Sequence, residues 1–153
     1  MRNLFLLLAS ISFLFISCSK DDEPATVSDA EKIVGVWKFT EVVIWNESTK
    51  TIGSSEEVTP CNGENTYVFE TTGRFAFETH YKNGEVCELT KSRTGDYTYN
   101  ENTKNIEVHF DTGHDQNFAV YKLSETEMWI NVGRINLENE EDTYYHILAY
   151  TKQ

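Results

Sequence analysis

Two cysteines in the middle of the chain, Cys61 and Cys87, are the residues best suited to covalent chemistry. They could form a disulfide, remain two separate buried thiols, or act as a redox pair. The redox pair is disfavoured because no Cys-x-x-Cys spacing is present. If the chain is exported, as its N-terminal residues indicate, an even pair favours the bridge, which would restrict the unfolded chain by ~3 kcal/mol in the chain-entropy model.

The four histidines are the other candidates for ligand chemistry. Their densest group is the segment His109-Phe-Asp-Thr-Gly-His114-Asp115. A zinc site needs converging His, Cys or carboxylate ligands, and a calcium loop needs regular oxygen ligands with a terminal Glu. The segment has neither pattern and is typical of a polar turn, so we expect no metal site.

Catalytic motifs are absent from the sequence. There is no Gly-x-Ser-x-Gly, no glycine-rich phosphate loop, and no histidine beside Cys61 or Cys87. The sequence therefore predicts a protein that is not an enzyme, and it indicates no cofactor. The formal net charge of −12 would repel a phosphate backbone, which argues against nucleic acid as a partner.

The N-terminal residues are typical of an export signal. Arg2 precedes the apolar run Leu4 to Ile16, which is shorter than the ~20 residues that span a bilayer. The following Ser17-Cys18 resembles the bacterial lipobox, in which the cysteine becomes the lipidated first residue of the mature protein. The alternative is an ordinary signal peptide followed by an unrelated cysteine.

These features predict three segments. Residues 1–17 are a lipoprotein signal peptide, residues 18–29 are a lipidated cysteine with a flexible acidic tether, and residues 30–153 are one folded domain. The lipid on Cys18, palmitate among its acyl groups, would attach the protein to the membrane of the cell envelope.

The residues after the tether predict strands, preceded by one short helix that Ser28 or Asp29 could cap. Apolar residues alternate with polar ones, as in Ile106-Glu-Val-His-Phe110, so one face of the sheet is apolar. Turn sequences separate eight strands: 36–45, 66–70, 74–81, 95–99, 106–110, 118–123, 127–132 and 143–152.

Eight sequential antiparallel strands with one apolar face favour an all-β fold, an eight-stranded antiparallel up-and-down barrel. A two-sheet sandwich is the competitor, but it usually needs long crossing connections. The longer connections expected here are only 46–63, 82–93 and 133–142.

The segment Ile33-Val34-Gly35-Val36-Trp37 resembles the opening of the lipocalin-like lipoproteins common in Bacteroidetes. A cysteine before the Thr-Tyr-Val-Phe strand, a second after the next strand, and Gly95-Asp-Tyr97 also resemble that family. The resemblance implies a barrel-floor motif at Gly35 and Trp37, with Lys152 where lipocalins have an Arg over the Trp. The acid-rich stretch after Cys18 resembles the signal for the outer face of the outer membrane.

The function of such a barrel depends on whether its aromatic side chains fill the interior or line a cavity. An eight-stranded barrel is either filled by side chains or holds one small ligand. If the barrel holds a ligand, we expect it to bind a small apolar or amphipathic molecule. If the barrel is filled, we expect a surface module that binds a protein or glycan through loops 46–63 and 133–142. The oligomeric state is left open. The candidate lining residues are Phe39, Phe75, Phe77, Tyr97, Tyr99, Phe118 and Trp129.

Overall fold

A computed structural model describes residues 27–135 and 142–153. The predicted signal peptide, Cys18 and most of the tether lie outside these described residues. The described elements are α1 (Asp29–Ile33), β1 (Gly35–Asn46), β2 (Thr51–Glu57), the 3-10 turn η1 (Asn62–Glu64), β3 (Thr66–Phe69), β4 (Arg74–Asn83), β5 (Val86–Asn100), β6 (Asn105–Phe110), β7 (Asp115–Leu123), β8 (Glu127–Ile135) and β9 (Tyr144–Lys152). Within the described ranges, no helix is long and apolar enough to cross a membrane.

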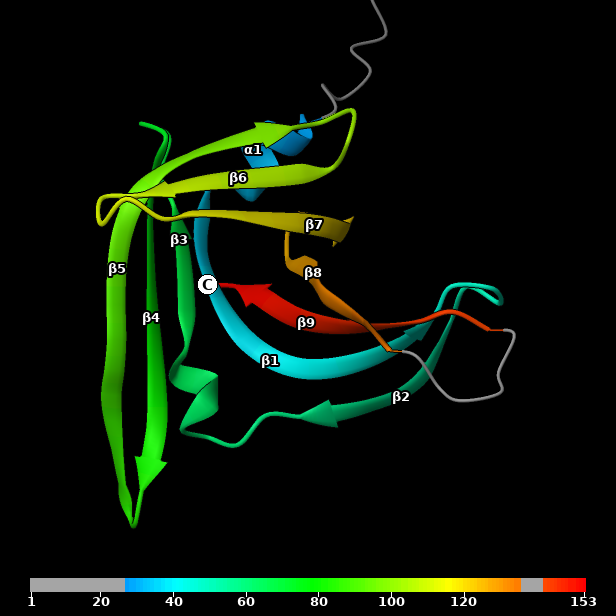
Figure 1. The fold of residues 1–153 in the computed structure, drawn as a ribbon, viewed down its shortest axis with the longest axis horizontal. Coiled ribbons are helices and arrows are strands. Elements are labelled where there is room, and N and C mark those ends of the chain that lie inside the picture. The colour runs from blue at the N-terminus through cyan, green and yellow to red at the C-terminus, as the bar shows by residue number, and fades with distance from the viewer. Residues whose placement is uncertain (1–26, 136–141) are drawn as a thin grey trace, which may run out of the picture.

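The strands form one antiparallel sheet that closes on itself. Each strand from β3 to β9 pairs with its neighbour in sequence, and β9 pairs back onto β1 over most of its length. Figure 1 shows β1 and β9 side by side beneath β6 and β7. The predicted antiparallel barrel is confirmed, and the pairing of β1 with β9 covers two edges that an open sheet would leave free.

The second strand of the barrel is split into two pieces, β2 and β3. Both pair with β1 on the edge that β9 does not occupy: Glu57 lies opposite Glu41, and Thr66 lies opposite Lys38. Residues 58–65 leave the sheet between the two pieces. The prediction of a loop at 46–63 is therefore wrong, because this segment contains β2, whose residues are all exposed.

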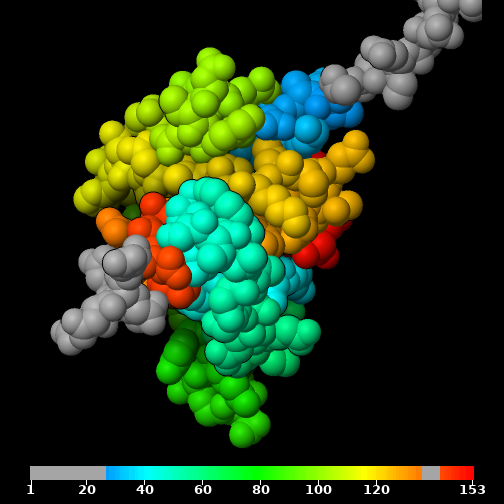
Figure 2. Space-filling view, turned by 90° about the vertical axis from the view of Figure 1, so that its right-hand side faces the viewer, coloured from blue at the N-terminus to red at the C-terminus, as the bar shows by residue number. Residues whose placement is uncertain are grey.

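The hairpin of β4 and β5 is longer than predicted. Its strands pair as far as Asn83 and Val86, so the expected loop 82–93 is mostly strand. β3 pairs with β4 only up to Glu78, and β6 pairs with β5 only from Gly95 onward. The outer half of the hairpin is therefore a two-stranded arm, and Figures 1 and 2 show it projecting from the body of the molecule.

The predicted short helix is confirmed, with Ser28 rather than Asp29 as its cap. Ser28 Oγ accepts from the Glu31 backbone N–H at 3.2 Å, and the Glu31 carboxylate accepts from the Ser28 N–H at 2.9 Å. This reciprocal pair satisfies two of the free N–H groups at the start of the helix. Asp29 instead forms ion pairs with Lys32 and Lys104.

The helix and the start of β1 seal one end of the barrel. Trp37 is completely buried, and its Nε1 donates to the Ile33 carbonyl at 2.7 Å. The Lys152 ammonium lies 5.4 Å from the centre of the Trp37 indole, the arrangement that the family resemblance implied. Gly35, with φ of +141°, lets the Lys152 chain pass, because a Cβ there would lie 2.5 Å from Lys152 Cε.

Candidate functional site

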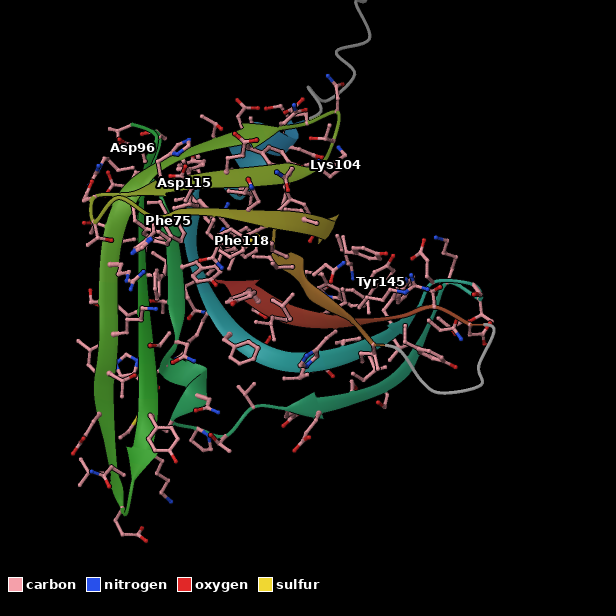
Figure 3. All side chains as sticks on the ribbon, viewed as in Figure 1. Phe75, Asp96, Lys104, Asp115, Phe118 and Tyr145 are labelled. Atoms are coloured by element: carbon pink, nitrogen blue, oxygen red, sulfur yellow. A yellow bond between two sulfur atoms is a disulfide. The ribbon has the colours of Figure 1, made fainter. Side chains whose placement is uncertain are left out.

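Six of the seven predicted lining residues belong to one hydrophobic cluster inside the ring. Phe75, Phe77 and Phe118 are buried members, and Phe39, Tyr97 and Tyr99 pack against them half-buried. Figure 3 shows Phe118 projecting from β7 into the ring, and its ring centre lies 6.4 Å from that of Phe75 on β4. Whether these six residues contact a ligand stays a prediction.

Trp129, the seventh predicted lining residue, faces the other way. It lies opposite Ala149, whereas its neighbour Met128 lies opposite Tyr150 of the interior cluster. Trp129 instead packs with Val43, Ile147 and Ala149 on the outer face of the sheet. The prediction was wrong because residues 128–130 are buried on both faces, so the sequence there has no alternation to show which face is inside.

The interior rings contact one another closely. Tyr67 stacks on Tyr150 with ring centres 4.9 Å apart, and it meets the ring of Phe77 edge-on at 6.1 Å. Burial raises the pKa of both tyrosines, so both hydroxyls stay protonated. The half of the barrel next to Trp37 is thus filled by side chains, as small barrels often are.

Two rings toward the arm keep some exposure. Phe77 is 8% exposed and Phe110 is 6% exposed, whereas Trp37 at the sealed end is 0% exposed. Their ring centres are 5.6 Å apart. The side chains at the Phe77 end are thus slightly less covered than those at the Trp37 end, and we call the Phe77 end the open end.

Two cations flank the open end. Arg93 lies opposite Phe77 across β4 and β5, and its guanidinium carbon is 5.6 Å from the centre of the Phe110 ring. Lys91 Nζ is 5.4 Å from the centre of the Phe77 ring. Neither cation forms an ion pair with a carboxylate of the described residues. The arrangement places positive charge beside apolar ring surface.

Lys91 and Arg93 were not among the residues singled out from the sequence. Both lie in the segment 82–93 that was expected to be a loop, where side-chain direction could not be assigned. The available signal was their spacing: two cations separated by one residue share a face if the segment is a strand.

The predicted disulfide between Cys61 and Cys87 is confirmed. Cys61 lies just before η1, and Cys87 lies near the tip of the arm, opposite Lys82. The bond ties the segment between β2 and β3 to the arm. Because the outer arm has no neighbouring strand, this covalent link holds it against the barrel.

The histidine segment forms a polar turn, in which His109 pairs with Asp115 and Asp111 pairs with Arg74. His109 Nδ1 and Asp115 Oδ1 are 2.8 Å apart on the exposed surface, and this hydrogen bond raises the pKa of His109. His109 lies on the face opposite Val108 and Phe110 of the interior. In the described ranges, no group of three His, Cys, Asp or Glu side chains could hold a metal ion.

The chain was compared with known proteins. A family model described as a lipocalin-like domain matches residues 33–130. No curated protein sequence matches the chain. Among solved structures, a bovine odorant-binding protein (a deswapped triple mutant) is 16% identical, with 82% of this chain and 75% of that chain covered and a TM-score of 0.38. An odorant-binding protein named OBP1 is 13% identical, with coverages of 80% and 73% and a TM-score of 0.38.

Proposed function

Because the chain belongs to the lipocalin-like domain family, we propose that it binds a small amphipathic molecule carrying an anionic group, at the open end of the barrel. The observation that carries this proposal is the position of Lys91 and Arg93 beside the rings of Phe77 and Phe110. Both cations lack a carboxylate partner among the described residues, so their charge is available to a ligand. The protein would bind this molecule without transforming it.

The two parts of such a ligand would make different contacts. Its apolar part would cover the small part of Phe77 and Phe110 that is still exposed, gaining about 25 cal/mol for each Å² of apolar surface buried, before the costs of association. Its anionic group would accept hydrogen bonds from Arg93, whose planar guanidinium can bind a carboxylate through two parallel bonds. Because the other half of the barrel is filled, the ligand would sit near the arm, far from Trp37.

Calorimetric titration of the full chain with decanoate and with decanol tests this proposal. The two probes share an alkyl chain and differ in the head group. We expect decanoate to bind more tightly, and Arg93→Gln to weaken decanoate binding by about tenfold, as loss of a charge-assisted hydrogen bond predicts. Arg134→Gln is the matched control, because Arg134 lies on β8 and contacts Thr143, just before β9, away from the arm.

Two results would contradict the anionic ligand. Equal affinity for decanoate and decanol would show that the cations play no part, and an unchanged decanoate affinity in Arg93→Gln would place the head group elsewhere. If neither probe binds, the result favours the second candidate function, a filled barrel that binds a protein or glycan through its surface. The filled interior and the exposed strand β2 favour that alternative.

The lipid on Cys18 is a separate part of the proposed function. It would hold the domain at the outer membrane, where the tether before Ser28 lets the barrel stand off the lipid surface. Cys18→Ala should release the protein from the membrane fraction, and Ser19→Ala should leave it there. Membrane attachment that persists in Cys18→Ala would argue against the anchor.

A further inference from the structure

Four aromatic side chains gather on the outer face of the sheet. Trp45 of β1, Tyr121 of β7 and Trp129 of β8 meet there, with Tyr145 of β9 beside Tyr121. Figure 3 shows Tyr145 on the part of β9 that lies away from the arm. Three of their neighbours, Val43, Ile147 and Ala149, are buried beneath them.

A hollow of about 340 Å³ opens among these rings, lined by Trp45, Tyr121, Lys122 and Trp129. We call it the outer aromatic pocket. The planes of Trp45 and Trp129 meet at 74°, with ring centres 5.9 Å apart, and those of Trp45 and Tyr121 also meet at 74°, at 6.4 Å. The walls are therefore nearly perpendicular, and they form a corner of aromatic surface.

A β-bulge brings Tyr121 and Lys122 to the same side. Val120 lies opposite Ile130 and Lys122 lies opposite Trp129, so Tyr121 is the extra residue of β7. Without the extra residue, two consecutive side chains would point to opposite faces. The bulge thus supplies one wall of the pocket and the cation beside it.

The polar edges of all three rings are already bonded to carboxylates. Trp45 Nε1 donates to Glu47 at 3.0 Å and the Tyr121 hydroxyl donates to the same carboxylate at 2.8 Å. Trp129 Nε1 donates to Glu127. Each indole has only this one donor, so the pocket keeps ring surface but no free indole N–H for a polar ligand. This favours a ligand that binds to ring faces.

A cation already occupies this surface. Lys122 Nζ lies 4.8 Å from the centre of the Trp129 ring, within the ~6 Å range of a cation–π contact. The same ammonium is 2.6 Å from a Glu127 oxygen, and the side chain of Lys122 keeps 47% of its surface exposed. Lys122 is therefore held from the solvent side and can turn away without disturbing the sheet.

We propose that the outer aromatic pocket binds an organic cation, a quaternary or methylated ammonium group, which replaces the Lys122 ammonium over Trp129. Such a group has few or no N–H bonds that need acceptors, and its methyl groups bury against the rings. The formal net charge of −12 attracts a cation to the protein, and the Glu127 carboxylate becomes available to it once the Lys122 ammonium is displaced. This site is independent of the proposed ligand at the open end, which has the opposite charge.

Tetramethylammonium chloride, added to the full chain and followed by the indole NMR signals, tests the proposal, with sodium chloride at equal ionic strength as reference. We expect saturable shifts of Trp45 and Trp129 but not of Trp37. Lys122→Met should tighten binding several-fold, because it removes the resident cation and leaves the Glu127 carboxylate unpaired. An increase in affinity cannot arise from loss of folding. Lys38→Met is the matched control. It removes a lysine that pairs with Glu64 at 3.2 Å but makes no cation–π contact, so the affinity should stay unchanged.

Two further probes distinguish whether the ammonium group belongs to a soluble ligand or to a lipid head group. Binding of free choline alone indicates a soluble ligand, whereas binding of phosphatidylcholine vesicles as well indicates a lipid head group; both support the pocket. Three results would overturn it. These are shifts no larger than those with sodium chloride, no tightening in Lys122→Met, or saturation by a neutral sugar such as N-acetylglucosamine with no response to tetramethylammonium.

Discussion

Trp37 and Trp129 belong to two aromatic groups that lie on opposite faces of one sheet. The indole of Trp37 is fully buried and bonds to a backbone carbonyl, whereas the indole of Trp129 borders a hollow and bonds to the Glu127 carboxylate. Inside the ring, aromatic side chains fill space against one another. On the outer face, charged groups hold the rings by their edges and leave their surfaces open. Similar residues thus build the core in one place and a pocket in the other.

Replacing the two indoles separately should give the largest effect that tests this contrast. Trp37→Ala should lower the free energy of unfolding by about 3–5 kcal/mol, because it leaves a cavity at the sealed end. Trp129→Ala should cost less, since part of its surroundings is already open. Chemical denaturation of both variants measures the difference. Equal losses would mean that the two groups contribute alike to the core.

Removing the disulfide should destabilise the protein without changing either aromatic group. Cys61→Ser frees the arm and should cost ~3 kcal/mol in the chain-entropy model. One free thiol at Cys87 should appear in the folded protein, while the indole signals of all three tryptophans keep their positions. A thiol count that does not change would contradict the bond.

A smaller change at the sealed end tests whether Gly35 is needed for the close approach of Lys152 to Trp37. Gly35→Ala should cost about 1–3 kcal/mol, because alanine is strained at φ of +141° and its Cβ would displace Lys152 from Trp37. Gly133→Ala is the matched control, since a Cβ there meets no atom within 4 Å. Thermal melts of the two variants should differ; a loss as large in Gly133→Ala would point to a general effect of the substitution.

Acid should shift the signals of the two outer indoles, because each of them bonds to a carboxylate, and this is the smallest effect expected. Hydrogen bonds from Lys50 and Tyr121 hold the pKa of Glu47 below its usual value. Burial alone would raise the pKa of Glu127, but hydrogen bonds from Lys122 and Trp129 outweigh this effect, so the pKa of Glu127 is also lowered. A lowered carboxyl pKa gives stability that is present above the ordinary value of about 4.3 and is lost as the pH falls through the folded value. The indole signals of Trp45 and Trp129 should titrate there, and that of Trp37 should not.

The parts of the fold that local sequence determines were predictable. The cap residue Ser28, predicted with Asp29 as its alternative, and the segment Gly35-Val-Trp37 act within a few positions of their partners, so their pattern indicated the helix and the sealed end. Alternation in β4 and β6 showed their inner faces correctly, because each of these strands has one face toward water.

The missed parts depend on contacts between distant segments. β2 has both faces exposed, so its sequence carries no pattern of burial, and it is a strand only because β1 offers it a free edge. The outer pocket depends on the bulge at Tyr121 and on Glu47, which reaches it from the turn after β1. The two cations of the open end face inward because the arm continues the sheet beyond the residues with alternating apolar side chains.

The pairing of β1 with β9 also sets an order for folding. β1 is the first strand of the ring to be synthesised and β9 is the last, so the two edges that they join stay bare until every other strand has been made. The intervening hairpins can form from local contacts, but ring closure must bring together the most distant strands and is expected to be slow. During that interval the unpaired edges could pair with other chains, so closure of the ring limits how long the nascent chain is exposed to aggregation.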